Sequence, residues 1–279
     1  MSLPTQSVID GVSDWVLPLA RYAGDLIMDI YHQASQDPKG AYGAFVRHKS
    51  DHSPLTRADL LAHHAILEGL LEHCPGWQVI SEESFEKGQM DRLGEYFWLV
   101  DPLDGTKEFL AQTGEFTVNI ALIHHRQPIF GVVYQPAADD LYWGGASVGA
   151  WRQQPGHAIE AVHVAASVAP PWRVMASRSH LGPKTQRMIE RMGNTRLVQS
   201  GSSLKFCRIA AGEADFYPRL GFTSQWDTAA AQAVLEGAGG FVIDAQGRRL
   251  LYGQSEIINP DFLATALPFD AVRGWWGDA

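Results

Sequence analysis

The sequence has few cysteines and no long apolar run, and these absences exclude several classes of protein. Only Cys74 and Cys207 occur in 279 residues, far apart and without a CxxC pattern, which favours ordinary buried thiols in a reducing compartment. No apolar stretch is long enough to span a bilayer, and the first residues lack the basic segment and apolar core of a secretory signal. We therefore expect a cytoplasmic protein without an integral membrane segment.

Basic residues are also scarce: 22 Lys and Arg stand against 31 Asp and Glu, giving a net charge of −9. This balance argues against binding a nucleic acid polymer, which requires a basic surface. Bound cations would neutralise part of the negative charge. A hydrophobic content of 46% fits a soluble protein with a sizeable core, and the length suits two domains, which we place at residues 1–165 and 166–279.

One stretch, residues 96–106, combines a buried strand with carboxylates at its end. Residues 96–100 are apolar, aromatic and β-branched, which is typical of a short buried strand. Asp101 and Asp104 follow where Pro102 should stop the pairing and Gly105 should let the backbone turn. Two carboxylates held this close repel each other unless a cation lies between them, and oxygen ligands favour a hard ion such as Mg²⁺. The alternative is an ordinary polar turn after a strand.

The first half of the chain predicts two helices and a sheet. Apolar residues at helical spacing from Val12 to Ile30 indicate a long amphipathic helix. Thr56 and Asp59 resemble a capping box, so a second helix is expected over residues 57–74, with Leu60, Leu67, Leu70 and Leu71 facing inward. Strands are expected at residues 78–81, 96–100, 116–123, 129–134, 141–143 and 149–152. Together they predict helices on one side of a mostly antiparallel sheet.

The pattern changes after residues 165–171, where strands and helices begin to alternate. The expected strands are residues 173–176, 195–199, 215–217 and, as the last one, 241–243. The expected helices are residues 183–192, 202–211 and 228–238. Alternation of this kind predicts an α/β unit.

Four other places carry candidate site residues. Glu82 and Glu83 stand at the end of a predicted strand, where a plain surface pair is the alternative. Residues 200–206 join a strand to a helix, and free N–H groups with the charge of Lys205 favour an anion there, unless the serines only cap the helix. Asp227 opens an alanine-rich helix, either as a cap or as another carboxylate. Residues 177–180, Ser-Arg-Ser-His, offer side chains suited to phosphate.

Asp51 and two pairs of histidines predict no metal site by themselves. Asp51 lies in the loop before the second helix, where a solvated turn residue is the favoured interpretation. His63 with His64, and His124 with His125, are sequence neighbours. Neighbours on a helix or strand do not face one another, so neither pair is expected to clamp a metal ion.

Three motifs together resemble the inositol monophosphatase superfamily of Mg²⁺-dependent, lithium-sensitive phosphatases. They are Glu82-Glu83, Asp101-Pro-Leu-Asp-Gly-Thr106 and Trp226-Asp227. Further stretches resemble its bisphosphate nucleotidase branch, namely Ser53-Pro-Leu-Thr56 and residues 101–109, 114–123, 177–180, 201–207, 217–219 and 226–230. The resemblance covers nearly the whole chain beyond the first ten or so residues, and it implies a layered αβαβα sandwich. Ser84 departs from the acidic run of many relatives, at a position that binds no metal in the family.

The resemblance also implies the metal ligands. One Mg²⁺ would be held by Glu82, Asp101 and the Leu103 carbonyl, and a second by Asp101, Asp104 and Asp227, with Asp101 bridging. A third, weaker ion would bind near Asp51 and Glu82. The cofactor is therefore expected to be Mg²⁺, as two or three ions.

The remaining implied roles concern water and substrate. Asp51 and Thr106 would orient and deprotonate the attacking water, and Gly105 with Thr106 would receive the scissile phosphate. The other nucleotide contacts would come from Ser177, His180, Ser203 and Lys205. The metal ligands Glu82, Leu103, Asp104 and Asp227 are also expected to bind the substrate.

The reaction implied by the resemblance is hydrolysis of the 3'-phosphate of 3'-phosphoadenosine 5'-phosphate to AMP, by a monomer or homodimer. Such an enzyme would be cytoplasmic, or peripheral on the cytoplasmic face of the inner membrane. An inositol monophosphatase or sugar bisphosphatase with the same mechanism is the main alternative, and a metal-dependent nucleotide sensor is the non-catalytic one. A phosphatase with an Asp-x-Asp-x-Thr nucleophile is disfavoured because Asp101 and Asp104 are one residue too far apart.

Overall fold

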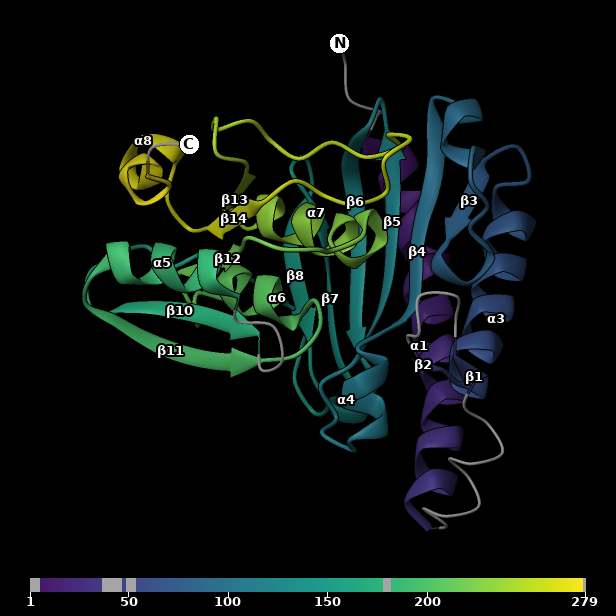
Figure 1. The fold of residues 1–279 in the computed structure, drawn as a ribbon. Helices are drawn as coiled ribbons and strands as arrows, with labels where there is room; N and C mark the ends of the chain where they lie inside the picture. The colour runs from purple at the N-terminus through teal and green to yellow at the C-terminus, as the bar shows by residue number, and fades with distance from the viewer. Residues whose placement is uncertain (1–5, 37–46, 49–53, 178–181, 278–279) are drawn as a thin grey trace.

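The computed structural model describes residues 6–36, 47–48, 54–177 and 182–277, and Figure 1 shows them in alternating layers of helices and sheets. Two helices, α1 (Gln6–Gln36) and α3 (Arg57–His73), pack together on one face of a seven-stranded sheet. Its other face meets α6 (Leu204–Ala210) and α7 (Ala229–Gly237), which separate it from a five-stranded sheet. A last helix, α5 (Pro183–Met192), covers the far face of that second sheet. The predicted αβαβα sandwich is confirmed.

The larger sheet is built entirely from the first half of the chain. Its strands run in the order β3 (Gln78–Ser81), β4 (Tyr96–Asp104), β5 (Thr117–His124), β6 (Gln127–Gln135), β7 (Asp140–Gly145), β8 (Gly149–Gln153) and β9 (Glu160–Ala161). Only the β3–β4 pair is parallel. The prediction of a mostly antiparallel sheet is therefore confirmed. A separate two-stranded ribbon joins β1 (Arg47–His48) to β2 (Pro54–Leu55).

The strand β4 is buried on both faces, which explains its continuous apolar sequence. Phe97 and Leu99 point into the core shared with α6 and α7. Trp98 and Val100 point into the core shared with α1 and α3. Alternate side chains of a strand face opposite ways, so a strand between two helical layers must be apolar at every position.

The smaller sheet comes from the second half and has the order β11-β10-β12-β14-β13. Its strands are β10 (Trp172–Ser177), β11 (Thr195–Ser200), β12 (Phe216–Arg219), β13 (Phe241–Ile243) and β14 (Phe262–Thr265). β10 is parallel to β11 and β12, whereas β14 is antiparallel to both of its neighbours. The expectation that residues 241–243 form the last strand is wrong. β14 follows and inserts between β12 and β13, and it is only four residues long, so its pairing partners define it more than its sequence does.

The inward face of α3 also differs from the prediction. Its buried side chains include Ala58, Ala62, Ile66 and Leu70, which are spaced by four residues. Leu71 is 42% exposed, so the prediction that it faces inward is wrong. The small side chains of Ala58 and Ala62 let α3 approach α1 and the sheet closely. A buried face that combines alanines with larger residues is less obvious in the sequence than a row of leucines.

The contact between the two halves is tight where α7 crosses the larger sheet. A side-chain carbon built on Gly131 of β6 would lie 2.1 Å from the Ala230 carbonyl oxygen, and one on Gly237 would lie 2.5 Å from the Gly149 oxygen. No residue with a side chain fits at such distances. Glycines therefore set the depth at which α7, and the short η4 turn (Gln225–Asp227) before it, lie on the sheet.

Two expectations from composition can be examined among the described residues. No helix in the described ranges is both long and apolar enough to cross a membrane. Cys207 is buried and Cys74 is half-buried, and both are free thiols.

The C-terminal Trp275 packs edge-on against Trp172 and Phe216 beside the smaller sheet. Both tryptophans therefore pack against the hydrophobic core that lies between that sheet and α5.

Candidate active site

The carboxylates of β4 are positioned by a bulge in the strand. Asp101 pairs with Asn119 and Asp104 pairs with Thr117, so the two residues between them face only one residue of β5. The prediction that Pro102 ends the strand is therefore wrong. Pro102 has no N–H to donate, the chain bulges there, and pairing resumes at Asp104. The bulge brings both carboxylates to the same cavity.

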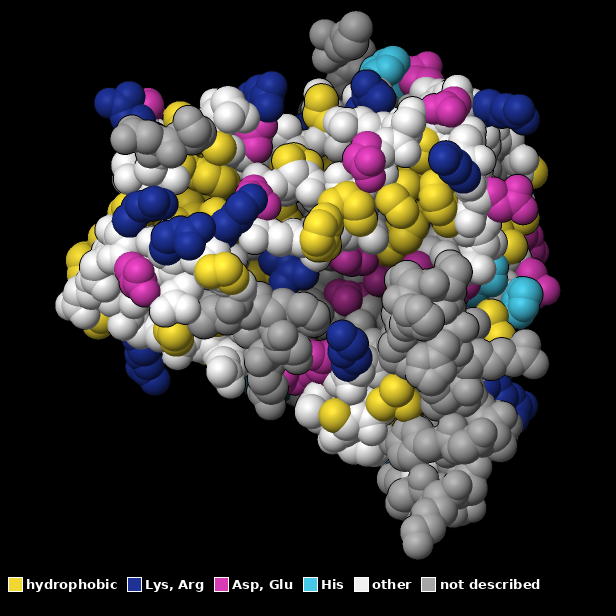
Figure 2. Space-filling model, in the orientation of Figure 1, with side chains coloured by type: hydrophobic (Ala, Val, Ile, Leu, Met, Phe, Trp, Pro, Cys, Tyr) yellow, Lys and Arg dark blue, Asp and Glu magenta, His cyan; other side chains and the backbone are white. Residues whose placement is uncertain are grey.

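This cavity has a volume of about 280 Å³ and lies between the two halves of the chain. Figure 2 shows acidic side chains gathered in a hollow of this face, with basic side chains beside them. Its walls come from the end of β4, the start of α4 (Thr106–Leu110), the η1 turn (Glu82–Ser84), α6, β12 and η4. The lining residues are Glu82, Asp101, Leu103, Asp104, Gly105, Thr106, Lys107, Glu108, Ser202, Lys205, Phe206, Tyr217, Arg219, Thr223, Asp227 and Thr228.

Three of these residues form a compact acidic cluster. One carboxylate oxygen each from Glu82, Asp101 and Asp227 lies within 4.8 Å of the others. Burial raises the pKa of Asp227 well above its usual range, and the negative charges of Asp104 and Glu82 raise it further. Carboxylates that disfavour each other's charge are stabilised by a cation among them, and oxygen donors suit a hard divalent ion. The residues present therefore fit a metal ion.

Polar side chains of both halves hold Asp104 in place. Ser203 Oγ lies 3.0 Å from Asp104 Oδ2 and 2.7 Å from the Asp227 carbonyl oxygen, and its single proton can serve only one of them at a time. Asn119 Nδ2 donates to Ser203 Oγ at 2.9 Å and lies 3.4 Å from Asp104 Oδ2. Ser202 Oγ donates to the Asp104 carbonyl oxygen at 2.9 Å. Sequence reasoning assigned Asn119 no role, since a lone asparagine within a strand gives no signal.

Gly105 and Thr106 follow the bulge and begin α4. Gly105 has a φ of 93°, in the left-handed region that favours glycine, and it allows the sharp turn into the helix. Thr106 Oγ1 lies 3.4 Å from Asp59 Oδ1, and Asp59 is fully buried. Asp59 Oδ2 accepts from the Thr56 N–H at 2.8 Å, so the predicted capping box is present. Sequence reasoning gave Asp59 only this capping role and missed its link to Thr106.

The opposite charge in the cavity comes from Lys107, Lys205 and Arg219. Lys205 Nζ donates to the Ser202 carbonyl at 2.5 Å and lies 5.1 Å from the centre of the Tyr217 ring. Burial lowers the pKa of Lys205 to about 8, against the opposing pull of the Asp104 charge. Arg219 ends β12, and its guanidinium donates to the Phe222 carbonyl. Sequence reasoning quoted the stretch around Arg219 without giving this residue a role.

Three predicted site residues are not brought to the cavity by the described structure. Asp51 and His180 lie outside the described residues. Ser177 is the last residue of β10 and pairs with Ser200, but its side chain is outside the described part as well. Their roles stay predictions.

The fold and this cavity can now be compared with known proteins. The model of the inositol monophosphatase family matches residues 11–268, and the chain belongs to this family. The chain is 43% identical over 250 residues to the 3'(2'),5'-bisphosphate nucleotidase CysQ of Escherichia coli (strain K12), covering 89% of this chain and 97% of that protein. The protein of the same name from Salmonella typhimurium is also 43% identical, over 90% of this chain and 98% of its own length.

Solved structures agree with this assignment. The crystal structure of CysQ from Bacteroides thetaiotaomicron superposes with a TM-score of 0.76 at 36% identity, covering 89% of this chain and 95% of that one. An IMPase from Thermotoga maritima superposes with a TM-score of 0.74 at 25% identity, covering 95% of this chain and 96% of that one. The layered architecture is thus shared along nearly the whole chain.

Proposed function

We propose that the protein is a Mg²⁺-dependent 3'(2'),5'-bisphosphate nucleotidase that converts 3'-phosphoadenosine 5'-phosphate to AMP and phosphate in the cytoplasm. One observation carries the proposal: the acidic cluster of Glu82, Asp101 and Asp227 shares its cavity with Lys205 and Arg219. A phosphate monoester needs cations at the phosphate that is cleaved. A substrate with a second phosphate also needs fixed positive charge for the group that it keeps.

The metal ligands proposed here are the ones that the family resemblance implies. Glu82, Asp101 and the Leu103 carbonyl would hold one ion, and Asp101, Asp104 and Asp227 would hold the other. Mg²⁺ bound there would polarise the phosphate and stabilise the departing ribose oxygen. It would also lower the pKa of the attacking water, so that hydroxide is available near neutral pH. The Leu103 N–H donates to Asp101 Oδ1 at 3.1 Å and so fixes the orientation of the shared ligand.

The chain's own residues would position the reacting groups. Thr106, together with Asp51, is proposed to orient the attacking water and take its proton. The buried Asp59 carboxylate holds the Thr106 hydroxyl and so restricts its orientation. Gly105 lines the cavity at the start of α4 and is proposed to receive the scissile phosphate together with Thr106. Positioning of this kind contributes much of the rate of a reaction without a covalent intermediate.

The remaining phosphate and the nucleotide would lie toward Lys205 and Arg219. Ser177 and His180 are proposed to contact the nucleotide, as the resemblance implies. Ser203 is 1% exposed, so its proposed contribution acts through Asp104, to which its hydroxyl is hydrogen-bonded. The proposed active unit is a monomer or a homodimer.

A substrate comparison tests this function. Phosphate release is measured with Mg²⁺ from equal concentrations of 3'-phosphoadenosine 5'-phosphate, inositol 1-phosphate and fructose 1,6-bisphosphate. We expect kcat/KM to be at least about tenfold higher for the nucleotide. Inositol 1-phosphate has no second phosphate, so Lys205 and Arg219 would be left without a phosphate to bind. A higher value for either competitor would move the function to an inositol or sugar phosphatase.

The metal requirement is tested on the same enzyme. A chelator should remove all activity, and added Mg²⁺ should restore it, because the acidic cavity alone repels a phosphate. Full activity after removal of divalent ions would contradict the mechanism for any of the three substrates. Nucleotide binding without turnover, in the presence of Mg²⁺, would instead identify a sensor.

A further inference from the structure

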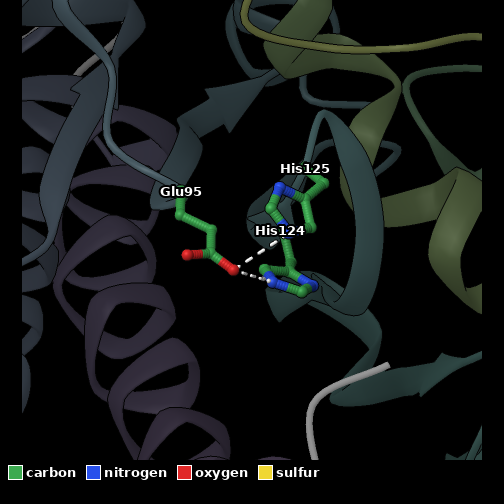
Figure 3. A group of neighbouring side chains, drawn as sticks. All are labelled: Glu95, His124 and His125. Carbon is green, nitrogen blue, oxygen red and sulfur yellow. Dashed lines mark hydrogen bonds and ion pairs between the residues drawn. The ribbon is translucent and has the colours of Figure 1, made fainter. Parts of the chain in front are cut away.

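A second group of metal-ligating side chains lies at the starting end of β4, far from the acidic cavity. Glu95 precedes β4, His124 ends β5, and His125 lies in the turn to β6. Glu95 Oε1 is 2.8 Å from His124 Nε2 and 2.9 Å from His125 Nε2, and Figure 3 shows both contacts on one oxygen. Glu95 is six residues before Asp101, about 20 Å along an extended strand. This group is therefore separate from the proposed active site.

The turn explains why two neighbouring histidines meet. His125 and Arg126 have φ values of 47° and 66°, so both residues of this two-residue turn are in the left-handed region. In a regular strand the two rings would point to opposite faces. The turn instead folds His125 back, and the ring centres of His124 and His125 are 4.1 Å apart. The expectation that this pair cannot face one ligand is wrong for that reason.

The other histidine pair is a useful contrast. His63 lies within α3, is buried, and bonds to Ser81 Oγ at 2.9 Å, whereas its neighbour His64 is exposed. The two ring centres lie 5.2 Å apart, but one ring is buried against Ser81 and the other is exposed to solvent. Only the pair at the turn is joined by a carboxylate among the residues that the structure describes.

The His124 ring and the backbone of the turn are held in place by their surroundings. The His124 ring stacks on Tyr96 at 4.2 Å, and Tyr96 stacks on Trp77 at 4.9 Å. The His125 backbone N–H donates to the Glu95 carbonyl oxygen at 3.1 Å, which ties the turn to the residue carrying the carboxylate. Ligands whose orientation is fixed in advance lose little entropy when an ion binds.

We propose that Glu95, His124 and His125 bind one first-row transition metal ion, such as Zn²⁺, Co²⁺ or Ni²⁺, through one carboxylate oxygen and two Nε2 atoms. Two imidazoles and a carboxylate are a donor set that these ions prefer and that Mg²⁺ does not. An ion about 2.1 Å from each donor needs donors about 3 Å apart for right angles at the metal and about 3.4 Å apart for tetrahedral angles. The separations of 2.8 and 2.9 Å are close to the first value, and a tetrahedral ion would require the Glu95 oxygen and the Nε2 atoms to move slightly apart.

The surroundings also leave room for the ion's other ligands. A cavity of about 340 Å³ adjoins the group and is lined by Asp91, Glu95, His125 and Arg126, among others. Asp91 and Arg126 carry opposite charges, so Glu95 provides the unbalanced negative charge that an incoming cation meets. To bind the ion, each imidazole must present an unprotonated Nε2, and a neutral ring then carries its proton on Nδ1. The occupied site would fasten the start of β4 to the β5–β6 turn.

The test titrates the full-length protein with Zn²⁺ in a large excess of Mg²⁺, and calorimetry counts the ions bound. The key variant is His125→Asn, because asparagine tolerates the left-handed turn and removes a ligand. Wild type should bind one Zn²⁺ per chain more than His125→Asn, or bind that ion at least about tenfold more tightly. Glu95→Gln should show the same loss.

A matched control separates this site from the acidic cavity. Asp104→Asn alters the cavity carboxylates and should keep the additional Zn²⁺ ion. In a Co²⁺-loaded wild-type protein, shifted ring N–H signals from two imidazoles should appear in the proton NMR spectrum and be absent in His125→Asn. Zn²⁺ should raise Tm more in wild type and in Asp104→Asn than in His125→Asn.

The result that overturns the proposal is equally definite. Equal Zn²⁺ stoichiometry and affinity in wild type, His125→Asn and Glu95→Gln would leave the three residues as a hydrogen-bonded cluster only. An unchanged Tm of His125→Asn without Zn²⁺, and unchanged turnover with Mg²⁺, confirm that the variant is folded. This test is independent of the proposed function, since it holds whichever phosphate ester the enzyme cleaves.

Discussion

The two ends of β4 place carboxylates in opposite electrostatic settings. At the carboxyl end, burial and the charges of Asp104 and Glu82 raise the pKa of Asp227. At the starting end, a hydrogen bond from His124 lowers the pKa of Glu95. At the carboxyl end, carboxylates lie together without positive charge among them, which favours a hard cation. At the starting end, a carboxylate lies with two imidazoles, which favours a softer cation. The two ends of one strand therefore carry two chemically distinct candidate metal sites, and the neighbouring residues determine which ion each would prefer.

The largest expected effect comes from removing one charge at the carboxyl end. Asp104→Asn should lower kcat by at least 10²–10³-fold, roughly the effect of losing one fixed electrostatic group in an active site. Phosphate-release kinetics measure it, and circular dichroism should show an intact fold. Glu95→Gln removes a charge at the other end of β4 and should leave kcat unchanged. Near-normal turnover of Asp104→Asn would remove this residue from the mechanism.

A smaller effect is expected from a residue that only supports a ligand. Ser203→Ala removes the hydroxyl that lies 3.0 Å from Asp104 Oδ2, and it should raise the Mg²⁺ concentration for half-maximal activity by about 10–100-fold. Activity measured over a range of Mg²⁺ concentrations gives this value. Ser200→Ala is the matched control, because Ser200 is also buried and, within the described part of the chain, its hydroxyl bonds only to the neighbouring Gly201 carbonyl. Equal Mg²⁺ requirements in the two variants would contradict the supporting role.

The smallest effect is a pH dependence on the basic side of the cavity. Burial lowers the pKa of Lys205 to about 8, so its ammonium is charged below that pH and loses its proton above it. KM for the nucleotide should therefore rise several-fold as the pH passes through about 8. Lys205→Arg should remove this inflection, because a guanidinium stays charged. An inflection that persists unchanged in Lys205→Arg would assign it to another group.

Local features of the fold were predictable from the sequence. The strand β3 and the helix α5 have the predicted bounds, because an apolar run and a proline at the first helical turn are signals that need no distant partner. Asp101 and Asp104 were likewise recognised by their place after an apolar strand. Their meeting with Asp227 is different, since it depends on how the two halves pack, and only the family resemblance indicated it.

The features that sequence reasoning missed depend on tertiary contacts. The bulge at Pro102 forms because β5 continues to pair beyond it, and β14 is a strand because β12 and β13 flank it. His125 meets His124 because the turn adopts left-handed angles without a glycine, so the usual signal of such a turn is missing. In each case the local sequence allows several conformations, and neighbouring segments select one.

The glycine contact under α7 has a consequence for how this enzyme can work. Gly131 leaves no space even for a methyl group against Ala230, so the start of α7, just after Asp227, lies directly on the sheet that carries Asp101. The cavity between the two halves is therefore bounded by tightly packed backbone, as a protein interior is. Moving the two halves apart would separate Asp227 from Asp101, so we expect substrate to enter and leave through the solvent-facing opening of the cavity without such a movement.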